Sequence, residues 1–165
     1  MPNANVSTFQ KMHECFNTTG PSNESRQNLV SIVQRMYDCF NRSDMDTIRN
    51  EVFARDLVWR LPGRHPLSGT KNGAEEVLAF FQQLRRANIS VELIRLDNFG
   101  DDTVVEVHRG RGQSGSAILD ALNCTHYRIA NGRIAEVQVY ISDQHAVDNF
   151  FSAVFQLKPI PDRLA

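Results

Sequence analysis

Four consecutive strand-like segments in the second half of the chain place the strongest constraint on its fold. They cover roughly residues 89–98, 103–111, 116–129 and 133–142, and no helical pattern interrupts them. The turns between them read FGDD, GQSG and NG, and the Asn131-Gly132 pair is a strong signal for a two-residue hairpin. Hairpins in sequence predict an antiparallel sheet.

Helical patterns flank this run of strands. From Glu24 onward, apolar residues recur at i, i+3, i+4 and i+7, as in a helix packed on a core. The segment SDMDTIRNEVF predicts a second, short helix capped by Ser43. A third helix is expected from Asn72, where NGAE has the form of a capping arrangement, and a closing helix from about Asp143. The first helix presents Leu29, Ile32, Val33, Met36, Tyr37 and Phe40 to the core.

A short strand is predicted between the second and third helices. Leu57, Trp59 and Leu61 occupy alternate positions, and Pro62-Gly63 then ends the strand. The segment RHPLSG is expected to cross the rim of the sheet before the third helix begins. This order of elements predicts an α+β fold in which a curved antiparallel sheet wraps around helices and leaves a cone with an open mouth.

The length and composition indicate one domain. A chain of 165 residues with 41% hydrophobic content builds one core of useful size. Residues 1–23 are rich in Asn, Ser and Thr and are predicted to be an N-terminal arm, followed by the domain at 24–158 and a tail at 159–165. Phe9, Met12 and Phe16 have helical spacing, so the arm is expected to be either a short docked helix or an unstructured tail.

Charge and cysteine content exclude several classes of partner. Eighteen basic and nineteen acidic residues give a net charge of -1, and no basic stripe is present, so we expect neither nucleic acid nor membrane as a partner. No signal-peptide pattern opens the chain, and the three cysteines have no metal-ligand spacing. We therefore expect a cytoplasmic protein with no metal and no cofactor.

Three segments, together with the order of elements, resemble a known family. They are VQRMYDCFNRSDMDTI, PLSGTKNGAEEVLAFF and YRIANGRIAEV. Over about residues 26–155 the chain resembles the SnoaL-like group, which includes polyketide cyclases, within the nuclear transport factor 2-like superfamily. The resemblance implies a cystatin-like cone, but no single activity, because this superfamily uses one cone for enzymes, ligand binders and assembly modules.

The segment VQRMYDCFNRSD is also similar to the first helix of bacterial ketosteroid isomerases. That resemblance implies an oxyanion hole made by a tyrosine on this helix and a protonated aspartic acid on the third long strand, with an aspartate before a proline as the base. Local matching puts these positions at Met36, Thr125 and Leu61. None of the three supplies the required group. The resemblance to the cyclases places their acid/base aspartate at Thr125 as well.

The same match indicates which strand residues face the cone. If Leu61 and Thr125 point inward, the two-residue period of strands places the residues two and four positions away from them on the same face. The expected pocket is mostly aromatic and aliphatic with a few polar points, which is typical of a small-molecule site. Its predicted lining residues are Met36, Leu57, Trp59, Leu61, His65, Asn123, Thr125, Tyr127, Val139 and Ile141.

Plainer structural roles remain open for several of these residues. A tryptophan on a half-buried strand, such as Trp59, is more often plain core than a ligand platform, and a lone loop histidine such as His65 is most often solvated. Asn123 and Thr125 are equally consistent with hydrogen bonds to one another or to a trapped water.

Residues of the opposite parity are expected on the outer face of the sheet. Asp120 and His126 belong to this set, and Asp143 is positioned to cap the closing helix. The outward set is unusually apolar for a solvated sheet face and predicts a homodimer formed through that face. Its apolar members are Ile118, Leu122, Cys124 and Tyr140.

Two functions are compatible with this pattern. The first is a protein that binds a small apolar molecule inside the cone without catalysis. The second is an enzyme of cyclase, isomerase or hydratase type on an apolar carbonyl compound, with an unidentified polar set and His65 as a candidate proton shuttle. Chemistry like that of limonene-epoxide hydrolase would need an Asp-Arg-Asp set in the cavity, and Arg109 and Asp120 are not clearly inward.

Overall fold

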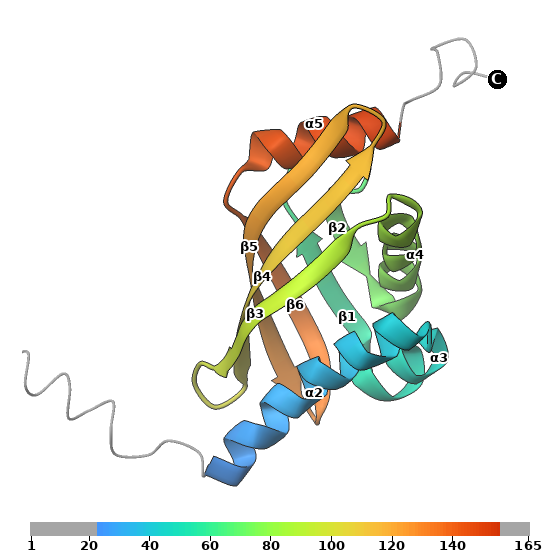
Figure 1. The fold of residues 1–165 in the computed structure, drawn as a ribbon. Coiled ribbons are helices and arrows are strands. Elements are labelled where there is room, and N and C mark those ends of the chain that lie inside the picture. Colours follow the sequence, from blue (N-terminus) through green and yellow to red (C-terminus); the bar gives the residue numbers. More distant parts are fainter. Residues whose placement is uncertain (1–22, 156–165) are drawn as a thin grey trace, which may run out of the picture.

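The computed structural model describes residues 23–155, with side chains from Asn28 onward. Figure 1 shows this part of the chain as helices packed against one curved sheet that does not close into a barrel. The predicted arm helix at Phe9, Met12 and Phe16 lies outside the described residues, and so does the predicted tail at 159–165.

The sheet has six strands in the spatial order β2-β1-β6-β5-β4-β3. All neighbouring strands are antiparallel except β1 and β6, which are parallel. The sheet is therefore mixed, whereas the sequence predicted a wholly antiparallel one. Short turns force antiparallel pairing only between consecutive strands, and most of the domain separates β1 from β6. The strands are β1 (Phe53–Leu61), β2 (Gly69–Asn72), β3 (Ser90–Asn98), β4 (Thr103–Ser114), β5 (Ala117–Ala130) and β6 (Arg133–Ile141).

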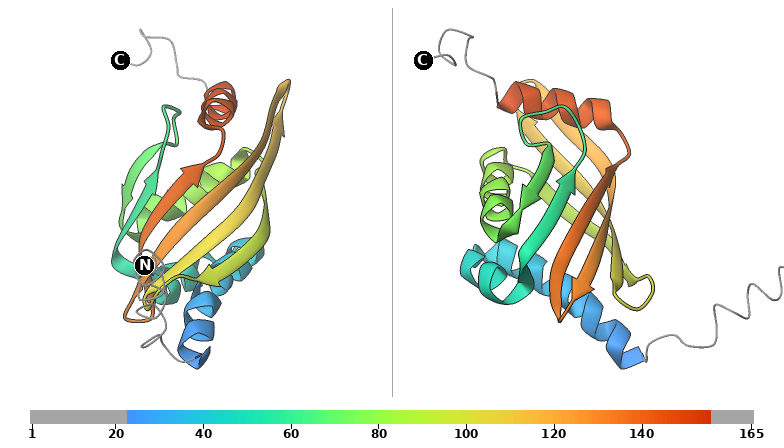
Figure 2. Two further views of the ribbon diagram at one scale, coloured as in Figure 1. Left: turned by 90° about the vertical axis from the view of Figure 1, so that its left-hand side faces the viewer. Right: turned by 180° about the vertical axis from the view of Figure 1, so that it is seen from behind.

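Three helices enclose the concave face of this sheet. α2 (Asn23–Arg42) packs against β3, β4 and β6, while α4 (Gly73–Arg86) packs against β1 and β2. α5 (Gln144–Val154) crosses the end of the sheet beside the β4–β5 hairpin (Figure 2). The expected cone is therefore present, with α5 across its mouth.

The turn after α2 differs from the sequence prediction. Asp44, not Ser43, caps the short helix α3 (Met45–Thr47), because the Asp44 carboxylate accepts the Thr47 N–H at 3.1 Å. Ser43 instead has a positive φ of 65°, which reverses the chain at the end of α2. The helix then continues as a wider π-helical turn, η1 (Ile48–Val52).

Strand β1 begins at Phe53, earlier than the alternation from Leu57 predicted. The segment after it forms the edge strand β2 as well as a rim loop, since residues 69–72 pair with β1. At the start of α4, Asn72 occupies the predicted cap position, but its side chain makes no capping bond. Its backbone N–H donates at 2.7 Å to the carboxylate of Glu76, one residue beyond the predicted partner Glu75, which instead pairs with Arg49.

Two clusters of buried apolar side chains fill the cone. The larger one joins α2 and α4 to the centre of the sheet and includes Trp59, Phe81 and Val137. The smaller one holds α5 on β5 through Phe150 and Leu119. The space between the helices and the concave face is therefore mostly core, and a cavity lies where the two clusters meet.

Candidate ligand-binding site

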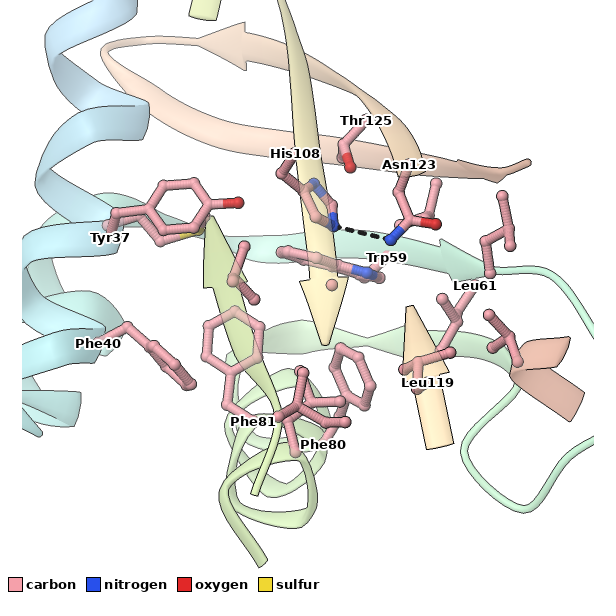
Figure 3. Close-up of a pocket in the computed structure, with 18 of the residues that line it drawn as sticks. Tyr37, Phe40, Trp59, Leu61, Phe80, Phe81, His108, Leu119, Asn123 and Thr125 are labelled. Atoms are coloured by element: carbon pink, nitrogen blue, oxygen red, sulfur yellow. Dashed lines mark hydrogen bonds between the residues drawn. The ribbon is translucent and has the colours of Figure 1, made fainter. Parts of the chain in front are cut away.

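A cavity of about 130 Å³ lies on the concave face of the sheet, enclosed by α2, α4 and α5 (Figure 3). Its lining is largely apolar. The helices contribute Met36, Tyr37, Phe40, Phe80, Phe81, Leu84, Val147 and Phe151, and Ile89 follows α4. The strands contribute Trp59, Leu61, Val91, His108, Gly110, Leu119, Asn123, Thr125, Tyr127, Val139 and Ile141.

Trp59 forms the centre of an aromatic wall. Its ring meets Phe81 edge-on at 5.3 Å between centroids and meets Tyr127 edge-on at 6.2 Å. These T-shaped contacts are the favoured geometry for aromatic pairs. Because rings on α4 and β5 hold the indole in place, Trp59 is both part of the core and a rigid surface of the cavity.

The structure brings eight of the ten predicted lining residues around this one cavity. They include Met36, Leu61 and Thr125, the three positions that the resemblance to the isomerases singled out. Leu57 is an exception, and its prediction as a lining residue was wrong. It has the inward parity but lies fully buried in the larger core cluster, because α4 packs over this part of β1.

His65 also lies away from the cavity, which corrects its predicted place in the lining. It is 4% exposed, its ring stacks on Phe151 at 4.8 Å between centroids, and its Nδ1 accepts the Leu67 N–H at 3.2 Å. Desolvation by burial lowers the pKa of His65, although the negative charge of Asp148 acts in the opposite direction. His65 is therefore a packed residue of the rim loop, where α5 covers it.

A carboxylate–histidine pair on β4 was not predicted from the sequence. Glu106 has no exposed surface, and its carboxylate accepts hydrogen bonds from His108 Nδ1 and from the Tyr127 hydroxyl, the latter at 2.6 Å. On its other side, His108 Nε2 lies 3.1 Å from Asn123 Nδ2. With Asn123 donating, His108 is the neutral tautomer that carries its proton on Nδ1.

Two tyrosines complete this polar cluster. Burial, and after it the charges and hydrogen bonds around Glu106, raise the pKa of Tyr37 well above its usual value. The pKa of Tyr127 is raised in the same way, first by burial and then by Tyr37 and Glu106. Both hydroxyls therefore stay protonated, and the Tyr127 hydroxyl donates to the buried carboxylate, which offsets part of the cost of burying it.

Two buried polar atoms on cavity-lining residues have no hydrogen-bond partner in the described part of the chain. They are the Trp59 indole nitrogen, which can only donate, and the Asn123 amide oxygen, which can only accept. Figure 3 shows Trp59 and the His108–Asn123 pair at the same cavity. A molecule held there would meet one free donor and one free acceptor within an apolar wall.

The other titratable residues considered from the sequence do not line the cavity. Asp120 binds Arg109 at 2.5 Å, and both side chains are about half exposed. His126 is absent from the lining, and the Asp143 carboxylate caps α5 by accepting the Ala146 N–H at 2.9 Å. The Asp-Arg-Asp route is therefore not supported by Arg109 and Asp120.

Residues 23–155 meet neither the requirements of a metal site nor those of a membrane-spanning helix. No cluster of three or more His, Cys, Asp and Glu side chains in this part of the chain is arranged to hold a metal ion. No helix of this part of the chain has the length and apolar character that crossing a membrane requires.

The hairpin register could have revealed the Glu106–His108 pair. β4 and β5 pair so that His108 faces Asn123 and Glu106 faces Thr125. Residues that pair directly across a hairpin point to the same face of the sheet. If Thr125 and Asn123 point into the cone, their partners Glu106 and His108 must do so as well.

Comparison with known proteins gives a family match, a relative of similar sequence and solved structures of similar fold. The family described as SnoaL-like domain matches residues 33–137. An uncharacterized protein of Mycobacterium tuberculosis is 26% identical over 105 residues, which make up 62% of this chain and 80% of that protein. The solved structure of Bal32a, from a soil-derived mobile gene cassette, superposes with a TM-score of 0.72 at 27% identity, over 77% of this chain and 98% of that one.

A second solved structure is similar in fold alone. It is a protein of unknown function with a cystatin-like fold from Xanthomonas campestris, with a TM-score of 0.67 at 24% identity, over 74% of this chain and 97% of that one. This likeness confirms the predicted α+β fold class.

Proposed function

The chain belongs to the SnoaL-like domain family, and from that premise we propose that it binds a single-ring, largely apolar molecule inside the cone. One observation carries the proposal. The cavity has a mostly apolar lining, yet Trp59 and Asn123 each hold a buried polar atom without a partner in the described part of the chain. An apolar ligand with one polar group would satisfy both features.

The cavity volume sets the size of the ligand. An apolar cavity of roughly 150 Å³ holds benzene, so about 130 Å³ suits a single ring. A molecule of several fused rings would have to displace α5 or the side chains of Phe80 and Phe81, which line the cavity. Packed cores resist such changes, since inserting extra groups costs about 1–3 kcal/mol or more.

Trp59 supplies the reporter for a direct test, because it is the only tryptophan of the chain and borders the cavity. We expect toluene, phenol and cyclohexanone to change its fluorescence saturably, and a steroid to leave it unchanged. Gly110→Ile should abolish the response, because it adds a side chain to a cavity-lining position.

Val107→Ile is the matched control, since residue 107 has the opposite parity on the same strand. It should respond like the native protein. If no single-ring compound changes the fluorescence of the native protein, Trp59 is packed core and the binding proposal fails.

The second candidate is an enzyme of cyclase, isomerase or hydratase type on an apolar carbonyl compound. The Glu106–His108 pair favours it, because a histidine held by a carboxylate is a common general base. Exchange of deuterium from solvent into the positions next to the carbonyl of cyclohexanone would report such a base. Exchange that the native protein does not accelerate would count against this candidate.

A further inference from the structure

The chemistry of the cavity identifies the polar group that its ligand carries. This inference rests on the proposed function above and deepens it. We propose that the ligand is a single-ring phenol, and that His108 is the base that accepts its hydroxyl proton.

The balance of donors and acceptors points to a hydroxyl group. His108 donates through Nδ1 to Glu106, which leaves Nε2 as an acceptor at the cavity. Asn123 Oδ1 is a second acceptor, and the Trp59 indole N–H is the donor without a partner in the described part of the chain. A ketone oxygen only accepts and would use Trp59 alone, whereas a hydroxyl both donates and accepts.

Glu106 prepares His108 to take the proton. The carboxylate fixes the ring through Nδ1 and stabilises the imidazolium that forms when Nε2 is protonated. It lies fully buried, where weak dielectric screening strengthens that attraction. The Tyr127 hydroxyl holds the second carboxylate oxygen at 2.6 Å, so the pair cannot rotate freely.

The proton transfer balances without a co-reactant. The phenol O–H bond breaks, its electron pair stays on oxygen, and the proton binds His108 Nε2, which exchanges its contact with Asn123 for the ligand. The Trp59 N–H then donates to the phenolate oxygen. A phenol suits this step because its pKa, about 10 for tyrosine, lies within a few units of about 6.5 for histidine. An aliphatic alcohol is far less acidic.

The test uses 4-nitrophenol, whose phenolate absorbs visible light while the neutral form does not. The native protein is titrated at a pH well below the pKa of the free compound. We expect the absorbance of bound phenolate to appear. We also expect binding about tenfold or more tighter than that of 4-nitrotoluene, which has a methyl group in place of the hydroxyl, because a charge-assisted hydrogen bond contributes on that scale.

Variants separate the base from the residue that orients it. His108→Gln should still bind 4-nitrotoluene, but it should hold 4-nitrophenol in the neutral form. Glu106→Gln should lower the phenolate fraction at unchanged affinity for 4-nitrotoluene, as expected of a positioning residue. His126→Gln, at a β5 position of outward parity, should match the native protein.

The outcomes distinguish this inference from the proposed function. Equal affinity for 4-nitrophenol and 4-nitrotoluene, without phenolate absorbance, overturns the assignment of His108 and leaves binding in the cone intact. Binding of neither compound overturns both. Phenolate absorbance that persists in His108→Gln would assign the proton to another group.

Discussion

Glu106 and His108 lie two residues apart on β4, and the buried carboxylate of the first accepts a hydrogen bond from Nδ1 of the second. A buried carboxylate is costly unless it is paired or hydrogen-bonded. Here β4 and β5 supply its hydrogen-bond partners, His108 and Tyr127, and the Tyr37 side chain of α2 lies nearby. Met36, Leu61 and Thr125 line the cavity together with His108, which its hydrogen bond to Glu106 holds in place.

Tyr127→Phe should destabilise the protein by about 1–3 kcal/mol, because it removes a hydroxyl donor from a buried carboxylate without changing the ring packing. Chemical denaturation with urea measures the change in the free energy of unfolding. Tyr140→Phe is the control, since Tyr140 is 56% exposed, and it should change stability little. Equal stability of the two variants would show that Glu106 does not depend on Tyr127.

His65 should make the protein less stable in mild acid. Burial lowers the pKa of His65 in the folded state, so the unfolded chain binds more protons as the pH falls through about 6.5, and stability is lost from there downward. His65→Phe keeps an aromatic ring against Phe151 and should flatten this part of the melting temperature–pH curve. His145→Gln, at an exposed position, should keep the native slope. If the melting temperature of His65→Phe depends on pH as steeply as that of the native protein, His65 is not the cause of the lower stability in acid.

We propose that the exposed apolar residues on the outer face of the sheet form a homodimer interface. Ile118, Leu122 and Tyr140 are 70%, 47% and 56% exposed. Light scattering at micromolar concentration should give twice the chain mass of 18.7 kDa. Leu122→Glu should shift the protein to the monomer, whereas Asn149→Glu, at an exposed position on α5, should not. A native monomer would disprove the interface.

The elements with strong periodicity were predictable from the sequence. The stripe beginning at Leu29, the Asn131-Gly132 turn and the Asp143 cap each depend on neighbours close in the chain, and the structure has all three. The family resemblance rested on three segments and on the order of elements, and it is confirmed by the match to residues 33–137.

Features that depend on distant partners were not predictable in the same way. β2 is a four-residue edge strand that exists because β1 offers it hydrogen bonds, and its sequence GTKN has little strand character. Leu57 has the parity of a lining residue, but it lies in the larger core cluster, which residues distant in the sequence complete. Glutamate is usually exposed to solvent, so nothing in the sequence indicated that Glu106 is buried. Its carboxylate is buried because His108 on β4 and Tyr127 on β5 form hydrogen bonds with it.

The most direct test of ligand binding in the cone is a crystal structure of the protein soaked with 4-bromophenol, whose bromine is located by anomalous scattering. We predict one bromine peak inside the cavity bounded by Trp59 and Phe81. The phenol oxygen should lie about 2.8 Å from His108 Nε2. A cavity without bromine, with the compound bound only on the outer surface, would contradict the account.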